Sequence, residues 1–272
     1  MRDKSTVNKT LLARELGVSR RSLYYQATKP AKDWALKCRI EEVLREFPSY
    51  GHKRLAIHLN FNKKRVRRVM RLFGIKPYRR RGRRPKRDKT LSTREYPNLL
   101  MVMPPVHPNH IWVADFTYLP FHGRFVYLAT VMDVFGREIV GWSVLTTHST
   151  QLVLGALFSA LQQHTAPAIF HSDNGREYAS KGFIEALTLL GVAVSRSKKS
   201  CPWENGYQES FYSQFKVDLG DPERFETLGE LVYEIHCRVQ HYNRRRIHSA
   251  LKMPPAAFAA AHRTATLQAI VH

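Results

Sequence analysis

Cysteine is scarce in this sequence, and its placement excludes two kinds of structural site. The three cysteines, Cys38, Cys201 and Cys237, are odd in number and form no Cys-x-x-Cys pair. This usage indicates a reducing compartment without a disulfide framework. The 13 histidines are scattered, and none pairs with cysteine at the spacing of a zinc finger. We therefore expect neither disulfides nor structural zinc.

Long apolar runs are also missing. The sequence contains no stretch of 18 consecutive apolar residues, which predicts no transmembrane helix and no membrane partner. Its first 17 residues lack the apolar segment of a signal peptide. The expected location is the cytoplasm. Hydrophobic residues make up 43% of the chain, which is enough for an ordinary packed core.

Acidic residues are few in the first part of the chain. Residues 1–104 contain 29 Lys and Arg against 8 Asp and Glu, whereas residues 105–272 contain 15 against 14. The net charge of +22 therefore belongs almost entirely to the first part. Such a basic segment favours a polyanionic partner, of which nucleic acid is the commonest. A basic surface that only improves solubility is the alternative.

Residues 6–26 have the pattern of a helix-turn-helix. Two leucines four residues apart share one helix face, Gly17 is suited to end that helix, and Ser19 is suited to begin the next. The second helix would present three residues to DNA, as a recognition helix does: Arg20, Arg21 and Ser22. A helical pair that serves only as core is the alternative.

A second helical segment follows at residues 34–76, with apolar residues at helical spacing. Its last helix carries six basic residues on the faces that are not apolar. Like charges on one short helix repel, so this run favours a bound anion. Three of the six are our candidate DNA contacts: Lys64, Arg65 and Arg68.

Beyond the Pro-rich residues 101–110, the pattern changes to β-branched and aromatic runs separated by turn residues. Three such runs are followed by helix, strand, helix, strand and further helices. This order predicts an α/β domain with a mixed sheet, whose first three strands are antiparallel. We divide the chain into a helix-turn-helix at 1–30, a similar helical domain at 31–76, a basic linker at 77–104, the α/β core with C-terminal helices at 105–262 and a tail at 263–272.

One glutamate of the core is expected on a rigid helix. Treated as a helix, residues 205–216 place Asn205, Glu209 and Lys216 on one polar stripe and three aromatic residues on the opposite face. Glu204 falls in the loop that opens this helix. For Glu209, a solvated side chain without a role is the alternative.

Two aspartates favour an active site. Asp115 lies inside an apolar strand, where a carboxylate is costly unless it is paired or binds a metal. Asp173 ends another strand and is followed by the turn residue Asn174. Such positions are a common place for chemistry. Asp133, near the end of its own strand, is the competing metal ligand, with a turn cap as the alternative.

Carboxylates without histidine or cysteine form a site made only of oxygen ligands, which selects Mg²⁺ or Mn²⁺ over zinc. Two such ions could support in-line displacement at phosphorus. Because clustered carboxylates repel, we expect their pKa values to be raised when no metal is present.

Three segments, "IWVADFTYL", "HSDNGREY" and "NGYQESFYSQFK", resemble the DDE motif of the retroviral-integrase superfamily. Thirty-five residues separate Asp173 from Glu209, and Lys216 follows the glutamate by seven positions, as is typical of that superfamily. The segments "YGHKRLAIHLN" and "YNRRRIHSALKMPPAAF" resemble insertion-sequence transposases of the IS-three family. The resemblance covers roughly residues 36–258.

This resemblance implies an RNase H-like core in which Asp115, Asp173 and Glu209 bind two Mg²⁺ ions, with Mn²⁺ able to substitute. It implies cleavage at the ends of a mobile element and attack of the freed 3′-OH on another phosphodiester. Lys216 would contact DNA beside the reacting phosphate, and Asn174 and Asn205 are further candidate DNA contacts.

The implied partners are double-stranded DNA at element ends and target, further copies of this chain and, as an open alternative, a protein from an upstream reading frame. The nucleoid of a bacterial cytoplasm is the implied location. Two other functions stay open at this point, a DNA-binding regulator that has lost catalysis and a Mg²⁺-dependent nuclease.

Overall fold

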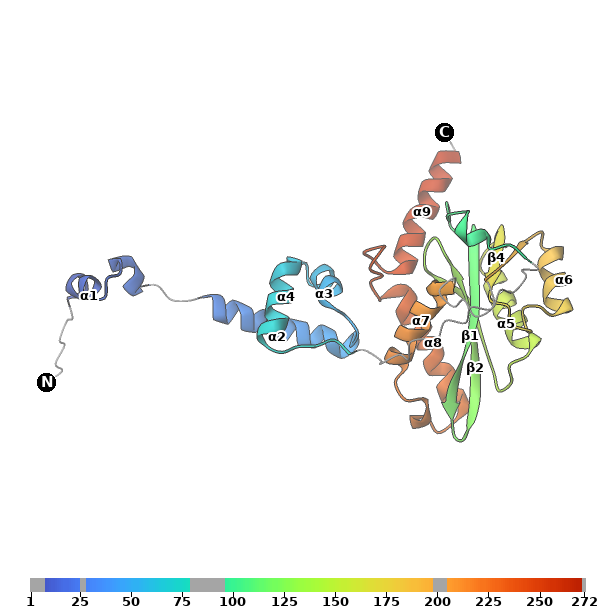
Figure 1. Cartoon of the computed structure of the whole chain (residues 1–272), viewed down its shortest axis with the longest axis horizontal. Helices are drawn as coiled ribbons and strands as arrows, with labels where there is room; N and C mark the ends of the chain where they lie inside the picture. The colour runs from blue at the N-terminus through green and yellow to red at the C-terminus, as the bar shows by residue number, and fades with distance from the viewer. Residues whose placement is uncertain (1–7, 25–27, 79–95, 198–204, 271–272) are drawn as a thin grey trace, which may run out of the picture.

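The structure, a computed structural model, describes residues 8–24, 28–78, 96–197 and 205–270, with side chains described as far as residue 262. Figure 1 shows two small helical units followed by an α/β core. We call residues 8–24 the first helical unit, residues 28–78 the second helical unit, and residues 96–197 with 205–270 the core. None of the described helices is long and apolar enough to cross a membrane.

The first helical unit consists of helix α1 (Lys9–Glu15) and the 3₁₀ helix η1 (Arg20–Tyr24). Gly17 adopts φ +62°, and Ser22 N donates to Ser19 Oγ at 3.2 Å, so both predicted helix boundaries are confirmed. The second element differs from the α-helix that the sequence predicted. Ser22 N also donates to Ser19 O, three residues back, which is the 3₁₀ pattern. Leu16 is 59% exposed, so the leucines of α1 form no closed core here.

The second helical unit packs α2 (Lys29–Glu46), α3 (His52–His58) and α4 (Lys63–Leu72) around a small core of their own. Leu36 and Ile40 of α2 meet Val66 of α4 there, as the apolar spacing predicted. Ile247, from the far end of the chain, closes the same cluster. This cluster therefore depends on the core as well as on its own three helices.

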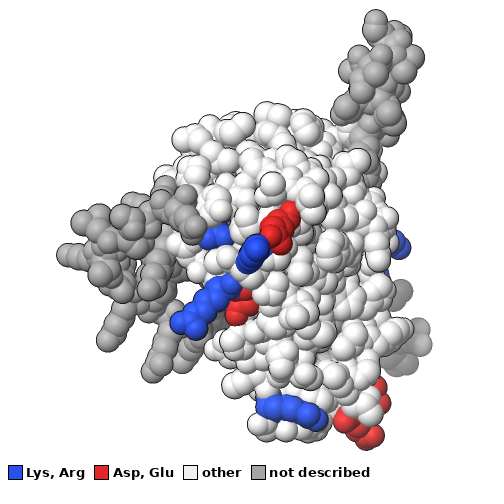
Figure 2. All heavy atoms as spheres, turned by 90° about the vertical axis from the view of Figure 1, so that its right-hand side faces the viewer, with Lys and Arg blue, Asp and Glu red and all other residues white. Residues whose placement is uncertain are grey.

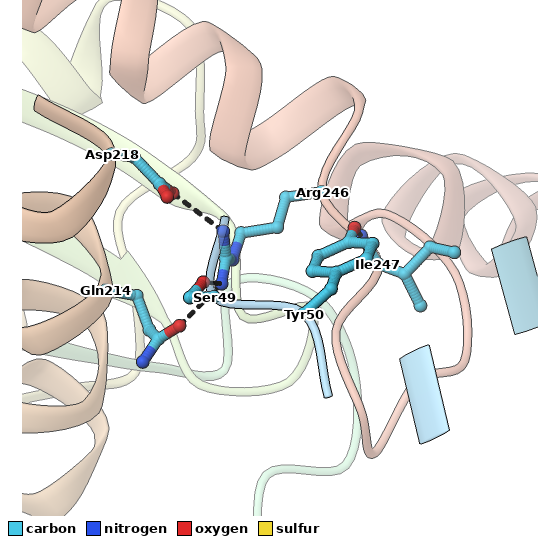
Figure 3. Close-up of polar contacts among 6 residues, drawn as sticks. All are labelled: Ser49, Tyr50, Gln214, Asp218, Arg246 and Ile247. Atoms are coloured by element: carbon cyan, nitrogen blue, oxygen red, sulfur yellow. Dashed lines mark hydrogen bonds and ion pairs between the residues drawn. The ribbon is translucent and has the colours of Figure 1, made fainter. Parts of the chain in front are cut away.

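Arg246 joins the second helical unit to the core (Figure 3). Only 2% of this residue is exposed, and it lies just after the long helix α8 (Leu228–Arg244). Its guanidinium donates to side chains of both parts: Asp218 at 2.7 Å, Gln214 at 2.5 Å and Ser49 at 2.6 Å. The N–H of Ile247 donates to the Tyr50 hydroxyl at 2.6 Å. One buried cation thus connects two parts that lie far apart in sequence.

The core contains a five-stranded sheet in the order β3-β2-β1-β4-β5. The strands are β1 (Ile111–Phe121), β2 (Arg124–Asp133), β3 (Ile139–Leu145), β4 (Ile169–Ser172) and β5 (Ala193–Arg196). The first three are antiparallel, and β4 and β5 join them in parallel, which confirms the predicted mixed sheet.

Helices cover both faces of this sheet (Figure 1). Alternate residues of β1 face opposite sides, so Ile111 and Val113 pack with α7 (Gly206–Leu219) and α8, while Trp112 and Ala114 pack with α5 (Thr150–Leu161) and α6 (Lys181–Leu189). Gly141 allows α5 to lie close to β3, because a Cβ there would be 2.3 Å from Ala156 O.

Short 3₁₀ helices at Leu99–Met101 (η2) and Pro222–Arg224 (η4) complete the core, together with the last helix, α9 (Pro255–Ile270). The boundary at residue 262 that the sequence predicted for the core therefore falls inside α9.

Candidate active site

The sheet brings two aspartates together on one face. Asp115 lies in the middle of β1, where it pairs with Thr130 of β2. Asp173 directly follows β4, which pairs in parallel with β1 through Val113 and His171. Two residues beyond the pair Val113 and His171, the same register sets Asp115 beside Asp173. Because side chains alternate between the two faces of a sheet, residues two apart share a face, so both aspartates lie on the same face as Val113 and His171. That face is the one covered by α7.

Buried side chains of α7 fix its first turns to the backbone around Asp115. Asn205 Nδ2 donates to Ala114 O at 3.1 Å, and Gln208 Nε2 donates to Val113 O at 2.8 Å. The Tyr212 hydroxyl donates to the carbonyl of Asp115 itself at 2.6 Å. A helix held at three successive turns has little freedom to shift, so the position of every other residue on it is set as well.

Glu209 lies on this fixed helix, and its side chain is exposed. Lys216, two turns further along α7, is partly buried, and its Nζ donates to Tyr118 O of β1 at 3.1 Å. The sequence placed Asn205 on the same polar stripe, but the structure buries it to 4% exposure against β1. In this structure the Asn205 amide therefore holds α7 in place, which explains why a polar residue is tolerated there.

The carboxylates act on one another electrostatically. Burial raises the pKa of Asp115 to about 7, and the nearby charges of Asp173 and, more weakly, Glu209 add to the rise. The N–H of Phe116, which donates to Asp115 Oδ1 at 2.8 Å, opposes it. Burial also raises the pKa of Asp173. These directions are the ones expected for clustered carboxylates that have no cation between them.

The donor set suits a hard divalent cation. All three side chains offer carboxylate oxygens, the ligands that Mg²⁺ prefers. Within the described ranges, however, no three His, Cys, Asp or Glu side chains converge closely enough to hold a metal ion as they stand. Glu209 is exposed and can rotate, whereas Asp115 is held within β1 and Asp173 directly follows β4. The carboxylates fit a metal site that side-chain rotation completes.

Asp133, the competing ligand, serves as a turn cap. Only 2% of this residue is exposed, and its oxygens accept hydrogen bonds from the N–H groups of Gly136 at 3.0 Å and Asn109 at 3.2 Å. These bonds occupy the carboxylate at the end of β2. Glu204, expected in the loop before α7, lies outside the described residues.

Replacing Asp115 by asparagine should stabilise the metal-free protein at high pH. The Asp115 pKa is raised from 3.8 to about 7, so between these values the folded state holds a proton that the unfolded chain has lost, and stability falls as pH rises. At pH 8 the substitution should raise the free energy of unfolding by about 2 kcal/mol, a value that allows for the partial exposure of Asp115. At pH 4 it should change the free energy of unfolding hardly at all. Thermal unfolding in EDTA at both pH values measures this.

The matched control is Glu185→Gln, which alters an exposed carboxylate on α6. It should leave the melting temperature nearly unchanged at both pH values. An Asp115→Asn protein that gains no more at pH 8 than at pH 4 would show that Asp115 has an ordinary pKa.

Comparisons with known proteins give the family. A model of the integrase core domain matches residues 105–202, and a second model of the same description matches residues 190–255. The transposase of insertion sequence element IS904 from Lactococcus lactis is 34% identical over 194 residues, which cover 70% of this chain and 77% of that protein. The transposase InsF of insertion sequence IS3A from Escherichia coli is 35% identical over 52% of this chain and 50% of its own length.

The chain belongs to the IS3 family of insertion-sequence transposases. It is a DNA transposase of the DDE type, a polynucleotidyl transferase that carries out strand transfer. Among solved structures, a chain of the simian T-cell lymphotropic virus intasome matches 79% of the transposase and 73% of its own length, with a TM-score of 0.51 and 17% identity. That likeness shows the fold, which is RNase H-like.

Two residues beside Asp173 of the transposase escaped the sequence analysis. Glu177, whose charge adds to the raised Asp173 pKa, pairs with His148 at 2.8 Å. Arg196 lowers the pKa of Asp173. It is 3% exposed and pairs with Ser172 in the sheet. Glu177 follows Asp173 by four positions, which is a signal that could have been noticed. Arg196 is recognisable only from the sheet order.

The candidate DNA contacts of the second helical unit do not share one environment. Lys64 is exposed, while Arg65 is partly buried and donates from Nη2 to Lys32 O at 3.4 Å. Arg68 forms a two-pronged pair with the buried Asp33, with one distance of 2.7 Å, and this bond lowers the Asp33 pKa. Arg68 is therefore engaged as the partner of a buried carboxylate, which the run of basic residues alone did not reveal.

The remaining candidates of the transposase lie on the surface. Arg20, Arg21 and Ser22 are exposed on η1, and the Ser22 hydroxyl lies 2.8 Å from that of Ser19. Asn174 is exposed directly after Asp173. These positions leave all four side chains accessible to DNA.

Proposed function

We propose that Asp115, Asp173 and Glu209 together hold two divalent cations, Mg²⁺ or Mn²⁺, for cleavage and joining of DNA strands. The observation that carries this proposal is the parallel register of β1 and β4, which sets Asp173 beside Asp115 on the face that α7 covers. The raised pKa of Asp115, caused by burial and by the charges of the other two carboxylates, agrees with it. A cation between them relieves the repulsion that raises it. When bound, such ions activate the attacking oxygen and stabilise the leaving oxygen.

The residues around the carboxylates position them and contact the substrate. The sheet holds Asp115 and Asp173 at fixed positions, and Gln208 and Tyr212 fix the helix that carries Glu209. Lys216 lies on the same helix, and its ammonium group would contact the phosphate next to the reacting phosphate. This arrangement orients a phosphodiester for attack by the 3′-OH of a cleaved end.

Double-stranded DNA is the proposed substrate, both as element ends and as target. The excess of Lys and Arg in residues 1–104 supports this, and so do the exposed Arg20, Arg21 and Lys64. Contacts from these side chains would mostly reach phosphates, which give affinity with little sequence information. We also propose Asn174 as a DNA contact near Asp173.

Further copies of the chain are the second proposed partner, because two element ends must be joined. Figure 2 shows the side of the core on which α5 and α6 lie, where charged side chains are sparse. Phe158 of α5 and Leu189 of α6 are 51% and 89% exposed. A surface with few charges and with exposed apolar residues suits contact between copies.

The test uses the full chain and labelled duplex DNA taken from either side of its gene. One set of duplexes ends in a 3′-OH at the element boundary, and a matched set ends in a 3′-deoxy nucleotide. Joining of the first set in Mg²⁺ or Mn²⁺, with none in EDTA and none for the second set, is the expected result. Joining of the 3′-deoxy set, or equal joining in EDTA, would contradict the proposed chemistry.

A further inference from the structure

A cavity of about 530 Å³ lies between the second helical unit and the core, away from the catalytic carboxylates. Arg54 of α3 lines it from the helical unit, and Arg137 lines it from the turn between β2 and β3. From α7 it takes Tyr207 and Phe211, which lie on the opposite side of that helix from Glu209. It is therefore separate from the site described above.

The described lining of this cavity is basic and contains no Asp or Glu. Of its three arginines, Arg246 is already bound to Asp218, Gln214 and Ser49 (Figure 3). The other two, Arg54 and Arg137, contact tyrosine rings, with Arg137 4.0 Å from the centre of the Tyr207 ring. Burial lowers the pKa of both arginines.

Several buried donors in this cavity have no acceptor within the described part of the chain. They are Nε of Arg54 and both Nε and Nη1 of Arg137. Nδ1 of His248 also has no partner there. Asp133 acts electrostatically on Arg137, but its oxygens already accept hydrogen bonds from the N–H groups of Gly136 and Asn109. Buried N–H groups without acceptors are costly, and an anion that enters the cavity would remove that cost.

The other wall of the cavity is apolar. Leu100, Met132 and Phe211 line it, so a simple inorganic anion would leave much of the space unused. His248 adds no charge at neutral pH, because burial and the neighbouring arginines lower its pKa to about 4. The cavity thus combines two guanidinium groups, a neutral imidazole and an apolar surface. A nucleotide, with a phosphate and a flat base, matches all three.

We propose that this cavity binds one unpaired nucleotide of the DNA, with its phosphate held by Arg54 and Arg137 and its base against Leu100, Met132 and Phe211. The proposal rests on the proposed function only in taking DNA as the source of the nucleotide. Because Arg54 belongs to the helical unit and Arg137 to the core, the bound nucleotide would also join these two parts.

The probe for the first experiment is deoxyadenosine monophosphate, titrated calorimetrically into the full chain. Deoxyadenosine and inorganic phosphate are titrated separately, and each should bind at least tenfold more weakly. Arg54→Gln and Arg137→Gln, which lie on different elements, should each weaken binding of the monophosphate at least tenfold. Arg244→Gln, an exposed arginine at the end of α8, is the matched control and should bind like the unaltered chain.

Two outcomes would overturn the inference. Inorganic phosphate that binds as tightly as the monophosphate excludes a nucleotide site, and monophosphate binding unchanged in both variants excludes this cavity. The same titration with Glu209→Gln should match the unaltered chain. A variant that binds the monophosphate but joins no DNA therefore tests the proposed catalytic roles and leaves the nucleotide site unaffected.

A second measurement tests whether the nucleotide in the cavity comes from DNA or is a free nucleotide. A duplex carrying 2-aminopurine near the element end should become several-fold more fluorescent on binding, because its base leaves the stack. The increase should be lost in Arg137→Gln at saturating protein and kept in Arg244→Gln. An increase that persists unchanged in Arg137→Gln, at every position of the fluorescent base, would show that the cavity takes no nucleotide from DNA.

Discussion

Glu209→Gln is expected to lower the rates of DNA cleavage and joining by about 10³-fold, because it removes one of the three charges proposed to hold the metal ions, worth several kcal/mol in the transition state. Glutamine keeps the length and shape of the side chain. Since Glu209 is exposed, stability should hardly change. Single-turnover assays on labelled element ends in Mg²⁺, with melting temperatures measured alongside, give both quantities.

The controls for Glu209 are two other glutamates. Glu185→Gln removes an exposed charge from α6 and should leave the rates within about twofold, as surface changes usually do. Glu204→Gln changes the neighbour that we place in the loop before α7, and it too should remain active. Loss of activity in Glu204→Gln alone would show that the proposed role belongs to Glu204 and not to Glu209.

Arg246→Met should destabilise the protein by about 3–5 kcal/mol, because it leaves the buried Asp218 without its cation. Arg246 is 2% exposed, and 7% of the Asp218 side chain is exposed, so water cannot replace the lost partner. Burial already raises the pKa of Asp218 even with Arg246 beside it. Urea unfolding at pH 7.5 measures the loss.

The neighbouring Arg245 provides a matched control for Arg246. It also contacts the second helical unit, through Glu46 at 2.8 Å, but 65% of its side chain is exposed. Arg245→Met should therefore cost no more than about 1 kcal/mol. The double variant Arg246→Met with Asp218→Leu should recover most of the lost stability, since both charges leave together. Equal losses for Arg245→Met and Arg246→Met would mean that burial of the pair is unimportant.

Local patterns were enough to predict much of the core. Alternating apolar and aromatic runs predicted three antiparallel strands, and Gly191, which adopts φ +68° after α6, marked a helix end. Helical spacing placed Glu209 on a helix with aromatic residues inward, as Phe211 and Phe215 are. These features depend on residues close together in the chain, so a single sequence contains the needed information.

The interactions that fix the site depend on contacts between distant segments. Gln208 is fully buried, with its amide bonded to Val113 O and to Thr130 O across two strands. Nothing in the local pattern separates this glutamine from a solvated one. Likewise, Arg244, Arg245 and Arg246 are identical neighbours in sequence, and only the approach of Ser49 and Asp218 makes the third one buried.

The anchoring of α7 has a consequence for how this protein can change over generations. Asn205, Gln208 and Tyr212 each bond to carbonyl groups of the backbone on β1. A carbonyl group is present whatever side chain the strand carries. Substitutions on β1 can therefore accumulate without loosening the helix, provided that the strand keeps its course. Drift on α7 has no such tolerance, because there the bonding atoms belong to the side chains.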